Sequence, residues 1–232
     1  MFANCNGKIM QTRAAVILTA ILLILGAVLA NVAFIGLGSV FNYPDILQSP
    51  TEEIFQKFNT NQGMIITWFL LLALGAGLLA PIAILIPRLF PSPLSRLTMW
   101  LGVAAAVVQV IGLLRWPLIV PGLIAGGDNA KFEFFHTLLG TIVGETSGYL
   151  LTGLWTILLL IWLRRVFAAS WFVWFGNIAA GLILLGVLIP LGVPGADMAN
   201  FIGYVLWSLW LITFAVLLLR KPHAKPVSTK HL

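Results

Sequence analysis

Two ionisable residues, Arg115 and Glu145, lie inside long apolar stretches of this chain. A charge in the hydrocarbon core of a bilayer costs free energy unless it is paired, protonated or hydrated. A guanidinium presents a planar set of donors that suits carboxylate, phosphate and carbonyl groups, whereas a carboxylate can pair with it or exchange a proton. These two residue types, in these positions, predict a site for ligand binding or proton handling.

The positions of the two residues favour an ion pair between them. Arg115 stands six residues before Pro121, which is about 9 Å from the end of its stretch at ~1.5 Å per residue. Glu145 stands about 18 Å into the next stretch on the same scale. Helical side chains point toward the N-terminus of their helix. In antiparallel neighbouring helices, the side chains of Arg115 and Glu145 therefore point toward the same depth in the membrane. The alternatives are an Arg115 that snorkels to the headgroups and a protonated Glu145 that bonds a neighbouring helix.

A polar face surrounds Glu145 in the helical pattern. Thr141 and Tyr149 are four residues before and after it, so all three share one side of an α-helix. Beside this face runs a row of small residues, Gly140, Gly144 and Gly148. Such rows allow close approach of two helix backbones, and we interpret the glycines as a packing surface.

Two aromatic residues complete the candidate set. Trp116 either stacks over a ligand or belongs to the aromatic belt at the membrane surface. His136 precedes Glu145 by nine residues, on the opposite side of a straight α-helix, so it is interpreted as an interfacial hydrogen-bonded side chain or a pH-sensitive ligand contact. The candidate ligand-binding residues are therefore Arg115, Trp116, His136, Thr141, Glu145 and Tyr149. The catalytic residues and the cofactor stay unknown at this point, and no metal site is expected.

The composition of the chain indicates which solvent surrounds these residues. The chain has 232 residues, of which 60% are hydrophobic and 9% charged, with a mean hydropathy of +1.04. Soluble domains are about one-quarter charged, so we expect lipid to be the solvent. The net charge of +6 does not indicate a nucleic-acid partner, because the basic residues are scattered at the ends of apolar stretches.

Six apolar stretches are long enough to cross a bilayer, which needs about 20 residues of helix. They are residues 14–41, 62–87, 97–121, 134–163, 171–193 and 201–219. We therefore predict an all-α polytopic membrane protein with a single transmembrane domain at 1–221. Residues 42–60 are expected to form a short amphipathic segment on the extracytoplasmic surface, and 222–232 a basic cytoplasmic tail.

Charge predicts the orientation of this domain. Ten of the 13 basic residues fall on one side of the predicted membrane, and that side is cytoplasmic under the positive-inside rule. We expect a multi-pass protein of the inner (plasma) membrane with both termini in the cytoplasm. The hexapeptide P-L-x-V-P-G occurs at Pro117–Gly122 and again at Pro190–Gly195. This recurrence is compatible with a parallel repeat of helical hairpins, and chance is its competitor.

Two sequence blocks resemble a known family. They are R-W-P-x-x-x-P, which begins at Arg115, and H-x-x-x-G-x-x-x-G-E, which begins at His136. They resemble an uncharacterised bacterial family of small six-helix membrane proteins that is catalogued as a domain of unknown function. The resemblance implies that the residues of these blocks are motif positions, and it implies no activity.

Three functions are compatible with these features. The first is binding or transport of a small or lipid-like ligand in an outward-facing pocket between the third and fourth spans, with Arg115 as anchor and Glu145 as counter-ion. The second is an enzyme that acts on a lipid-like substrate, with Glu145 as general acid or base. The third is an accessory subunit of a larger membrane complex, or a homo-oligomer, in which the pair is structural.

Overall fold

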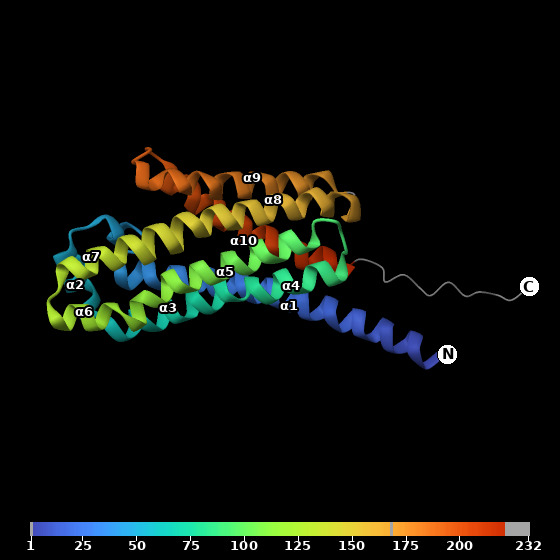
Figure 1. Cartoon of the computed structure of the whole chain (residues 1–232), viewed down its shortest axis with the longest axis horizontal. Coiled ribbons are helices and arrows are strands. Elements are labelled where there is room, and N and C mark those ends of the chain that lie inside the picture. Colours follow the sequence, from blue (N-terminus) through green and yellow to red (C-terminus); the bar gives the residue numbers. More distant parts are fainter. Residues whose placement is uncertain (1, 168, 221–232) are drawn as a thin grey trace, which may run out of the picture.

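The computed structural model describes the backbone of residues 2–167 and 169–220, and side chains from residue 13 onward. The predicted basic tail at 222–232 lies outside the described residues. The described chain consists of helices joined by short connections (Figure 1). Its elements are α1 (Phe2–Phe41), η1 (Asp45–Gln48), α2 (Thr51–Thr60), α3 (Gln62–Gly77), α4 (Leu79–Leu89), α5 (Ser95–Leu118), α6 (Val120–Gly126), α7 (Asn129–Phe135), η2 (His136–Ser147), α8 (Gly148–Phe167), α9 (Ser170–Leu185), η3 (Gly186–Leu191) and α10 (Ala196–Arg220).

These elements join into six apolar helical spans within the described part of the chain, which confirms the predicted fold class. They are Arg13–Phe41, Gln62–Leu89, Ser95–Gly126, Asn129–Phe167, Ser170–Leu191 and Ala196–Arg220. Helices satisfy their own backbone hydrogen bonds, so they are the form in which such apolar stretches can enter lipid. The protein is therefore an integral, multi-pass membrane protein, and its outer surface contacts the lipid bilayer.

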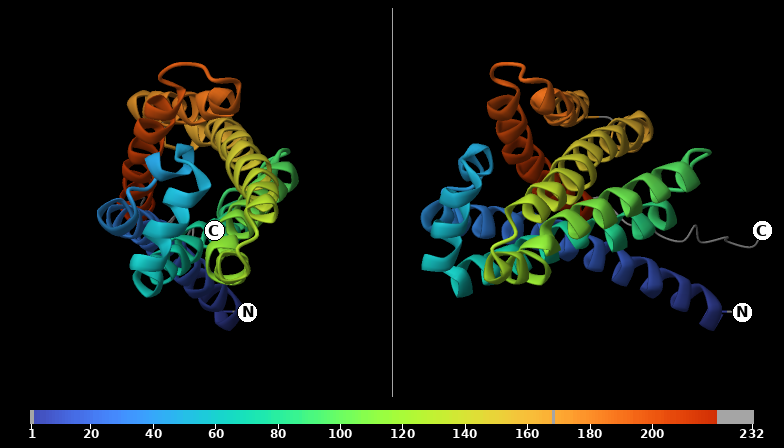
Figure 2. Two further views of the ribbon diagram at one scale, coloured as in Figure 1. Left: turned by 90° about the vertical axis from the view of Figure 1, so that its left-hand side faces the viewer. Right: turned by 60° about the vertical axis from the view of Figure 1, so that its left-hand side comes forward.

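The six spans form a ring in which each span packs on the next. α1 packs on α3 and α4, which pack on α5; α5 packs on η2 and α8; and α8 packs on α9. α10 packs on both α9 and α1 and so closes the ring. Viewed along the bundle, the spans surround a central axis (Figure 2). This closure brings side chains from the first and last spans next to those from the middle of the chain.

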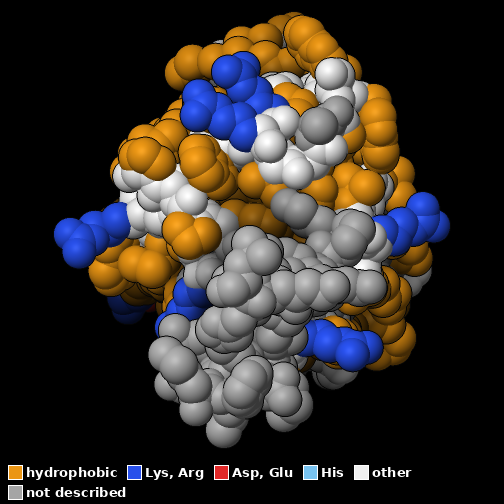
Figure 3. Space-filling view, turned by 90° about the vertical axis from the view of Figure 1, so that its right-hand side faces the viewer, with side chains coloured by type: hydrophobic (Ala, Val, Ile, Leu, Met, Phe, Trp, Pro, Cys, Tyr) orange, Lys and Arg blue, Asp and Glu red, His pale blue; other side chains and the backbone are white. Residues whose placement is uncertain are grey.

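The two ends of the bundle differ in charge. Six acids lie at the end that carries the loops after α1, α6 and η3, which we call the acidic end: Asp45, Glu52, Glu53, Asp128, Glu133 and Asp197. The opposite end, which we call the basic end, carries Arg88, Arg96, Arg164, Arg165 and Arg220. Figure 3 views the basic end, where arginine or lysine side chains are visible around an apolar surface and no acidic side chain is in view.

An aromatic cluster lies beneath the acidic end. Its members Phe41, Phe58, Phe69, Trp116 and Phe132 are all at most 2% exposed. The Trp116 ring stacks on that of Phe69 with centroids 5.0 Å apart and meets Phe41 edge-on, also at 5.0 Å. Aromatic pairs of this kind stabilise by about 0.5–1.5 kcal/mol each beyond the area they bury. The aromatic cluster therefore joins the first four spans to α2.

The segment between the first two spans crosses the acidic end of the ring (Figure 2). Its buried residues include Ile46, Ile54 and Phe58. Thr51 donates a hydrogen bond to Glu133 at 3.1 Å, and Glu52 accepts one from Asn129 at 3.0 Å. The apolar face of this amphipathic segment packs against protein, whereas the sequence alone suggested that it would face the membrane surface.

The two P-L-x-V-P-G copies adopt different backbones. Pro117–Gly122 passes from α5 into α6. Pro190–Gly195 leaves the 3-10 helix η3 through a turn in which Gly192 and Gly195 have φ of 70° and 79°. A shared hexapeptide therefore does not carry a shared local structure, and the hairpin repeat stays a prediction.

Candidate functional site

Arg115 and Glu145 meet inside the bundle. Arg115 Nη2 lies 3.9 Å from Glu145 Oε1, and the two side chains are 4% and 23% exposed. Arg115 Nη1 also donates a hydrogen bond to the carbonyl of Gly112 at 2.5 Å. The guanidinium therefore turns into the protein and does not snorkel to the headgroups. Opposite charges attract strongly where water is scarce, which accounts for this arrangement.

Glycines make room for the guanidinium. A Cβ added at Gly140 would lie 2.6 Å from Arg115 Nη2 and 2.7 Å from Arg115 Cζ. One turn further along, the backbones of Gly112 and Gly144 touch, because a Cβ at Gly112 would lie 2.5 Å from Gly144 Cα. The predicted packing role of the glycine row is confirmed. α5 and η2 lie so close that no pocket separates them at this level.

The helix that carries Glu145 is wound as a π-helix from His136 to Ser147. The Ser147 hydroxyl bonds the carbonyl of Ile142, five residues earlier, at 2.9 Å. In this winding the backbone bonds also span five residues, so about nine residues complete two turns. His136 and Glu145 are therefore on the same side of the helix. The α-helical expectation that they lie on opposite sides is wrong for this reason.

Arg115 and Glu145 face a central cavity of about 780 Å³. Residues from all six spans line it, and it is therefore wider than the pocket between the third and fourth spans that the sequence suggested. Apolar walls come from side chains such as Phe34, Leu72 and Leu211. The exposed residues Asp45 and Asp197 belong to its lining, so the cavity reaches the acidic end.

Three tyrosines from different spans and loops add hydroxyl groups to the cavity. Tyr149 lies one turn from Glu145, Tyr204 comes from α10, and Tyr43 comes from the loop after α1. Burial raises the pKa of Tyr43, and the negative charge of Glu145 raises it further, while Arg115 opposes the shift. Tyr43 is therefore neutral at physiological pH and can donate or accept a hydrogen bond beside the pair.

Amide and hydroxyl side chains along the cavity are held by the helices that carry them. Asn31 donates to the carbonyl of Ala27 at 2.7 Å. Gln109 donates to the carbonyl of Ala105 at 3.1 Å and to the Thr152 hydroxyl at 3.2 Å. Such bonds fix the orientation of the amides, so the polar lining is ordered before any ligand arrives.

The candidate residues from the sequence divide into two groups. Arg115, Glu145 and Tyr149 line the cavity, whereas Trp116, His136 and Thr141 do not. Trp116 is fully buried in the aromatic cluster, beneath Arg115 at 5.2 Å from Cζ to the ring centroid. His136 packs against the rings of Trp116 and Phe132. Trp116 therefore contacts the guanidinium without lining the cavity, and His136 contacts Trp116.

Tyr43, Asn200 and Tyr204 are cavity residues that the sequence did not place in the site. Tyr43 belongs to a polar loop, and the other two belong to the last span, where a polar side chain is typical of contacts between helices. No periodicity links them to Arg115. Among the described residues there is no group of three His, Cys, Asp or Glu side chains that could hold a metal ion.

The arrangement combines a fixed cation, a carboxylate and neutral donors at one side of an apolar space. The distance of 3.9 Å within the ion pair exceeds that of a hydrogen bond, which is about 2.7–3.2 Å. Arg115 Nε is buried without a hydrogen-bond partner among the described residues. Chemically, the site can bind a polar group by charge-assisted hydrogen bonds while apolar walls cover the rest of the molecule.

Comparisons with known proteins identify a family and no characterised relative. The family model described as Domain of unknown function (DUF4386) matches residues 18–215. Neither the curated proteins nor the solved structures include a match to this chain. Because the family model covers most of the sequence, including both spans that carry the ion pair, the chain belongs to this family of proteins of unknown function.

Proposed function

We propose that this protein binds a small amphiphile, a molecule with one polar group and an apolar body, in its central cavity. The observation that carries the proposal is the Arg115–Glu145 pair: both residues line the cavity, their charged atoms are 3.9 Å apart, and Arg115 Nε has no hydrogen-bond partner among the described residues. A polar group placed between the two side chains would supply this missing partner. The volume of about 780 Å³ falls within the range of about 300–1,000 Å³ that is typical of ligand sites.

The lining favours an amphiphile over a fully polar solute. Phe34, Leu72 and Leu211 surround the space beside the pair, and apolar surface of this kind contributes about 25 cal/mol for each Å² that a ligand covers. Asp45 and Asp197 at the acidic end disfavour the entry of an anion with no apolar part. A transporter would use the same site and open it alternately to the two sides of the membrane, so ligand binding is the first requirement for transport too.

The acidic end is proposed to face away from the cytoplasm. The described arginines outside the cavity gather at the basic end, and the positive-inside rule places that end in the cytoplasm. The cavity would then open outward. An inner-membrane location with cytoplasmic termini follows from the same rule, and labelling of Asp197→Cys in intact cells, in a Cys5→Ser background, checks it.

A cavity-filling substitution tests the proposal. Ala76 lines the cavity, whereas Leu74 on the same helix is 55% exposed to the outside of the bundle. Ala76→Trp and Leu74→Trp are therefore matched variants. The probes are a medium-chain fatty acid, the corresponding alcohol and the corresponding amine, and the measurement is thermal unfolding of the full chain in lipid nanodiscs.

We expect at least one probe to raise the Tm of the wild type and of Leu74→Trp, and to leave Ala76→Trp unchanged. Arg115→Ala and Glu145→Gln should each lose the same stabilisation, since both remove a bond to the polar group. An equal rise of Tm in Ala76→Trp would show that the probes act through the bilayer, and would overturn the proposal.

A further inference from the structure

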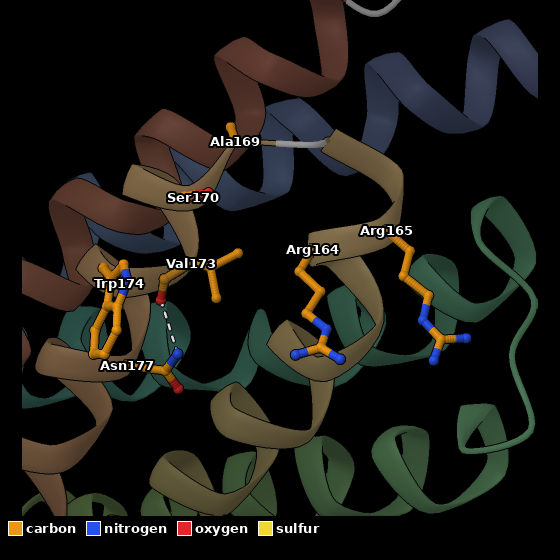
Figure 4. A pocket seen from close by; sticks show the side chains of 7 residues that line it. All are labelled: Arg164, Arg165, Ala169, Ser170, Val173, Trp174 and Asn177. Atoms are coloured by element: carbon orange, nitrogen blue, oxygen red, sulfur yellow. Dashed lines mark hydrogen bonds between the residues drawn. The ribbon is translucent and has the colours of Figure 1, made fainter.

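A second hollow lies at the basic end, between the end of α8 and the beginning of α9. Its volume is about 590 Å³, and its lining includes Arg164, Arg165, Ser170, Trp174 and Asn177. Figure 4 shows Arg164 extended into this space on the side where Asn177 lies. Two cations and two uncharged polar side chains therefore surround one hollow, which is distant from the central cavity.

Among the residues that the structure describes, the arginines of this hollow have no acidic partner. The sequence holds seven acids; six of them lie at the acidic end, and Glu145 lies beside Arg115. Arg165 rests over the ring of Trp162, at 5.8 Å from Cζ to the centroid. In the described part of the chain no acidic side chain lies near Arg164 or Arg165, and both arginines are exposed, so both can bind an anion from outside the chain.

The surroundings of the hollow are those of a membrane surface. It lies where the apolar spans α8 and α9 end, and Trp171 and Trp174 are 58% and 68% exposed beside it. Exposed tryptophans mark the headgroup level of membrane proteins. The anion at that level is the phosphate of a phospholipid, and arginine binds phosphate through two parallel hydrogen bonds. The amide of Asn177 donates to the carbonyl of Val173 at 3.0 Å, which leaves its oxygen free to accept a bond.

We propose that this hollow binds the headgroup of an anionic phospholipid, with the phosphate held by Arg164 and Arg165. The apolar chains would lie along the outer surface of α8 and α9, where Ile161 and Ile178 are 45% and 53% exposed. Basic hollows between spans on the cytoplasmic side are suited to such headgroups. The site is independent of the central cavity and of the function proposed for it.

Matched double variants test this site in the full-length protein. Arg164→Gln/Arg165→Gln removes both cations of the hollow. Arg88→Gln/Arg96→Gln removes two exposed cations from the same end that do not line it. The protein is reconstituted in nanodiscs of phosphatidylglycerol and phosphatidylcholine, and native mass spectrometry counts the lipids of each type that stay bound.

The wild type and Arg88→Gln/Arg96→Gln should retain phosphatidylglycerol in preference to phosphatidylcholine. Arg164→Gln/Arg165→Gln should retain it about tenfold less, the effect of losing one charge-assisted hydrogen bond or more. Arg164→Lys keeps the charge and loses the paired hydrogen bonds, so it should fall between them. Equal retention by the two double variants would show a general attraction of basic residues to the membrane, and would overturn the site.

A free phosphate is distinguished from a lipid headgroup by a second measurement. Thermal unfolding of the protein in detergent is followed with added phosphatidylglycerol or with added inorganic phosphate. The proposal expects a rise of Tm with the lipid that depends on Arg164 and Arg165, and none with inorganic phosphate at the same concentration. An equal rise with inorganic phosphate would overturn the assignment to a lipid. Loss of solubility in a variant is separated from loss of binding by the unfolding curve without ligand.

Discussion

Gly112→Ala tests the closest contact in the site, where α5 meets η2 backbone against backbone. The added Cβ would lie 2.5 Å from Gly144 Cα and 2.9 Å from the carbonyl oxygen of Leu139. The optimal separation of non-bonded carbon atoms is about 3.5–4.0 Å, so the two helices must separate by about 1 Å. No flexible side chain can move aside to absorb this, because the opposing atoms are backbone.

The expected cost follows from two opposing effects. Overpacking of a well-packed interior costs about 1–3 kcal/mol. Alanine is favoured over glycine within a helix by about 1 kcal/mol, which offsets part of that cost. Gly181 supplies the matched control, since it is exposed in the middle of α9 and an added Cβ would meet nothing within 4 Å. Gly181→Ala carries the same helical gain without the collision.

The measurement is the free energy of unfolding of both variants in the same bilayer-like medium, by equilibrium titration with a denaturing detergent. Gly112→Ala should be less stable than Gly181→Ala by about 1–3 kcal/mol, because the helical term cancels in the difference. It should also lose the stabilisation by amphiphile probes, since Arg115 and Glu145 stand on the two helices that separate. Equal stability of the two variants would refute the close backbone contact.

Three further predictions concern the pair, the aromatic cluster and the loop tyrosine. Glu145→Gln should lower the free energy of unfolding by less than the ~3–5 kcal/mol typical of a broken buried pair, because Glu145 keeps 23% exposure. A double-mutant cycle with Arg115→Met measures the coupling between the two side chains, and a value below about 0.5 kcal/mol would contradict the pairing. Phe58→Ala should cost about 3–5 kcal/mol in the unfolding titration, since Phe58 is fully buried, and a cost near zero would show that α2 does not pack on the bundle. The pKa of Tyr43 is raised in the folded protein, so its contribution to stability is complete below the ordinary phenol pKa of about 10 and is lost as the pH rises above it. Tyr43→Phe should therefore lose less stability than the wild type between neutral pH and pH values above about 10. Parallel pH profiles of the two proteins would count against a raised pKa of the Tyr43 phenol.

The sequence by itself determined the six spans, and it favoured the meeting of Arg115 with Glu145 while leaving a snorkelling Arg115 and a protonated Glu145 as alternatives. The length of a span follows from the thickness of the hydrocarbon core of the bilayer, so an apolar stretch of that length predicts a span whatever the helix packs against. The pair was predictable because the depth and lean of a helical side chain depend on its position within its own helix. The packing role of the glycine row was predictable in the same way, since it needs only the spacing along one helix.

Only the tertiary structure decided what surrounds the pair. The π-helix between His136 and Ser147 changes which side chains share a face, and the hydropathy pattern does not record whether the backbone bonds span four residues or five. Tyr43 and Tyr204 reach the site because the ring of spans closes between α1 and α10, a contact between the two ends of the chain. Trp116 has the composition of an interfacial residue, and it is buried because α2 folds back over it. Local pattern fixes depth and direction along one helix, whereas the neighbours across the bundle depend on contacts that no single segment contains.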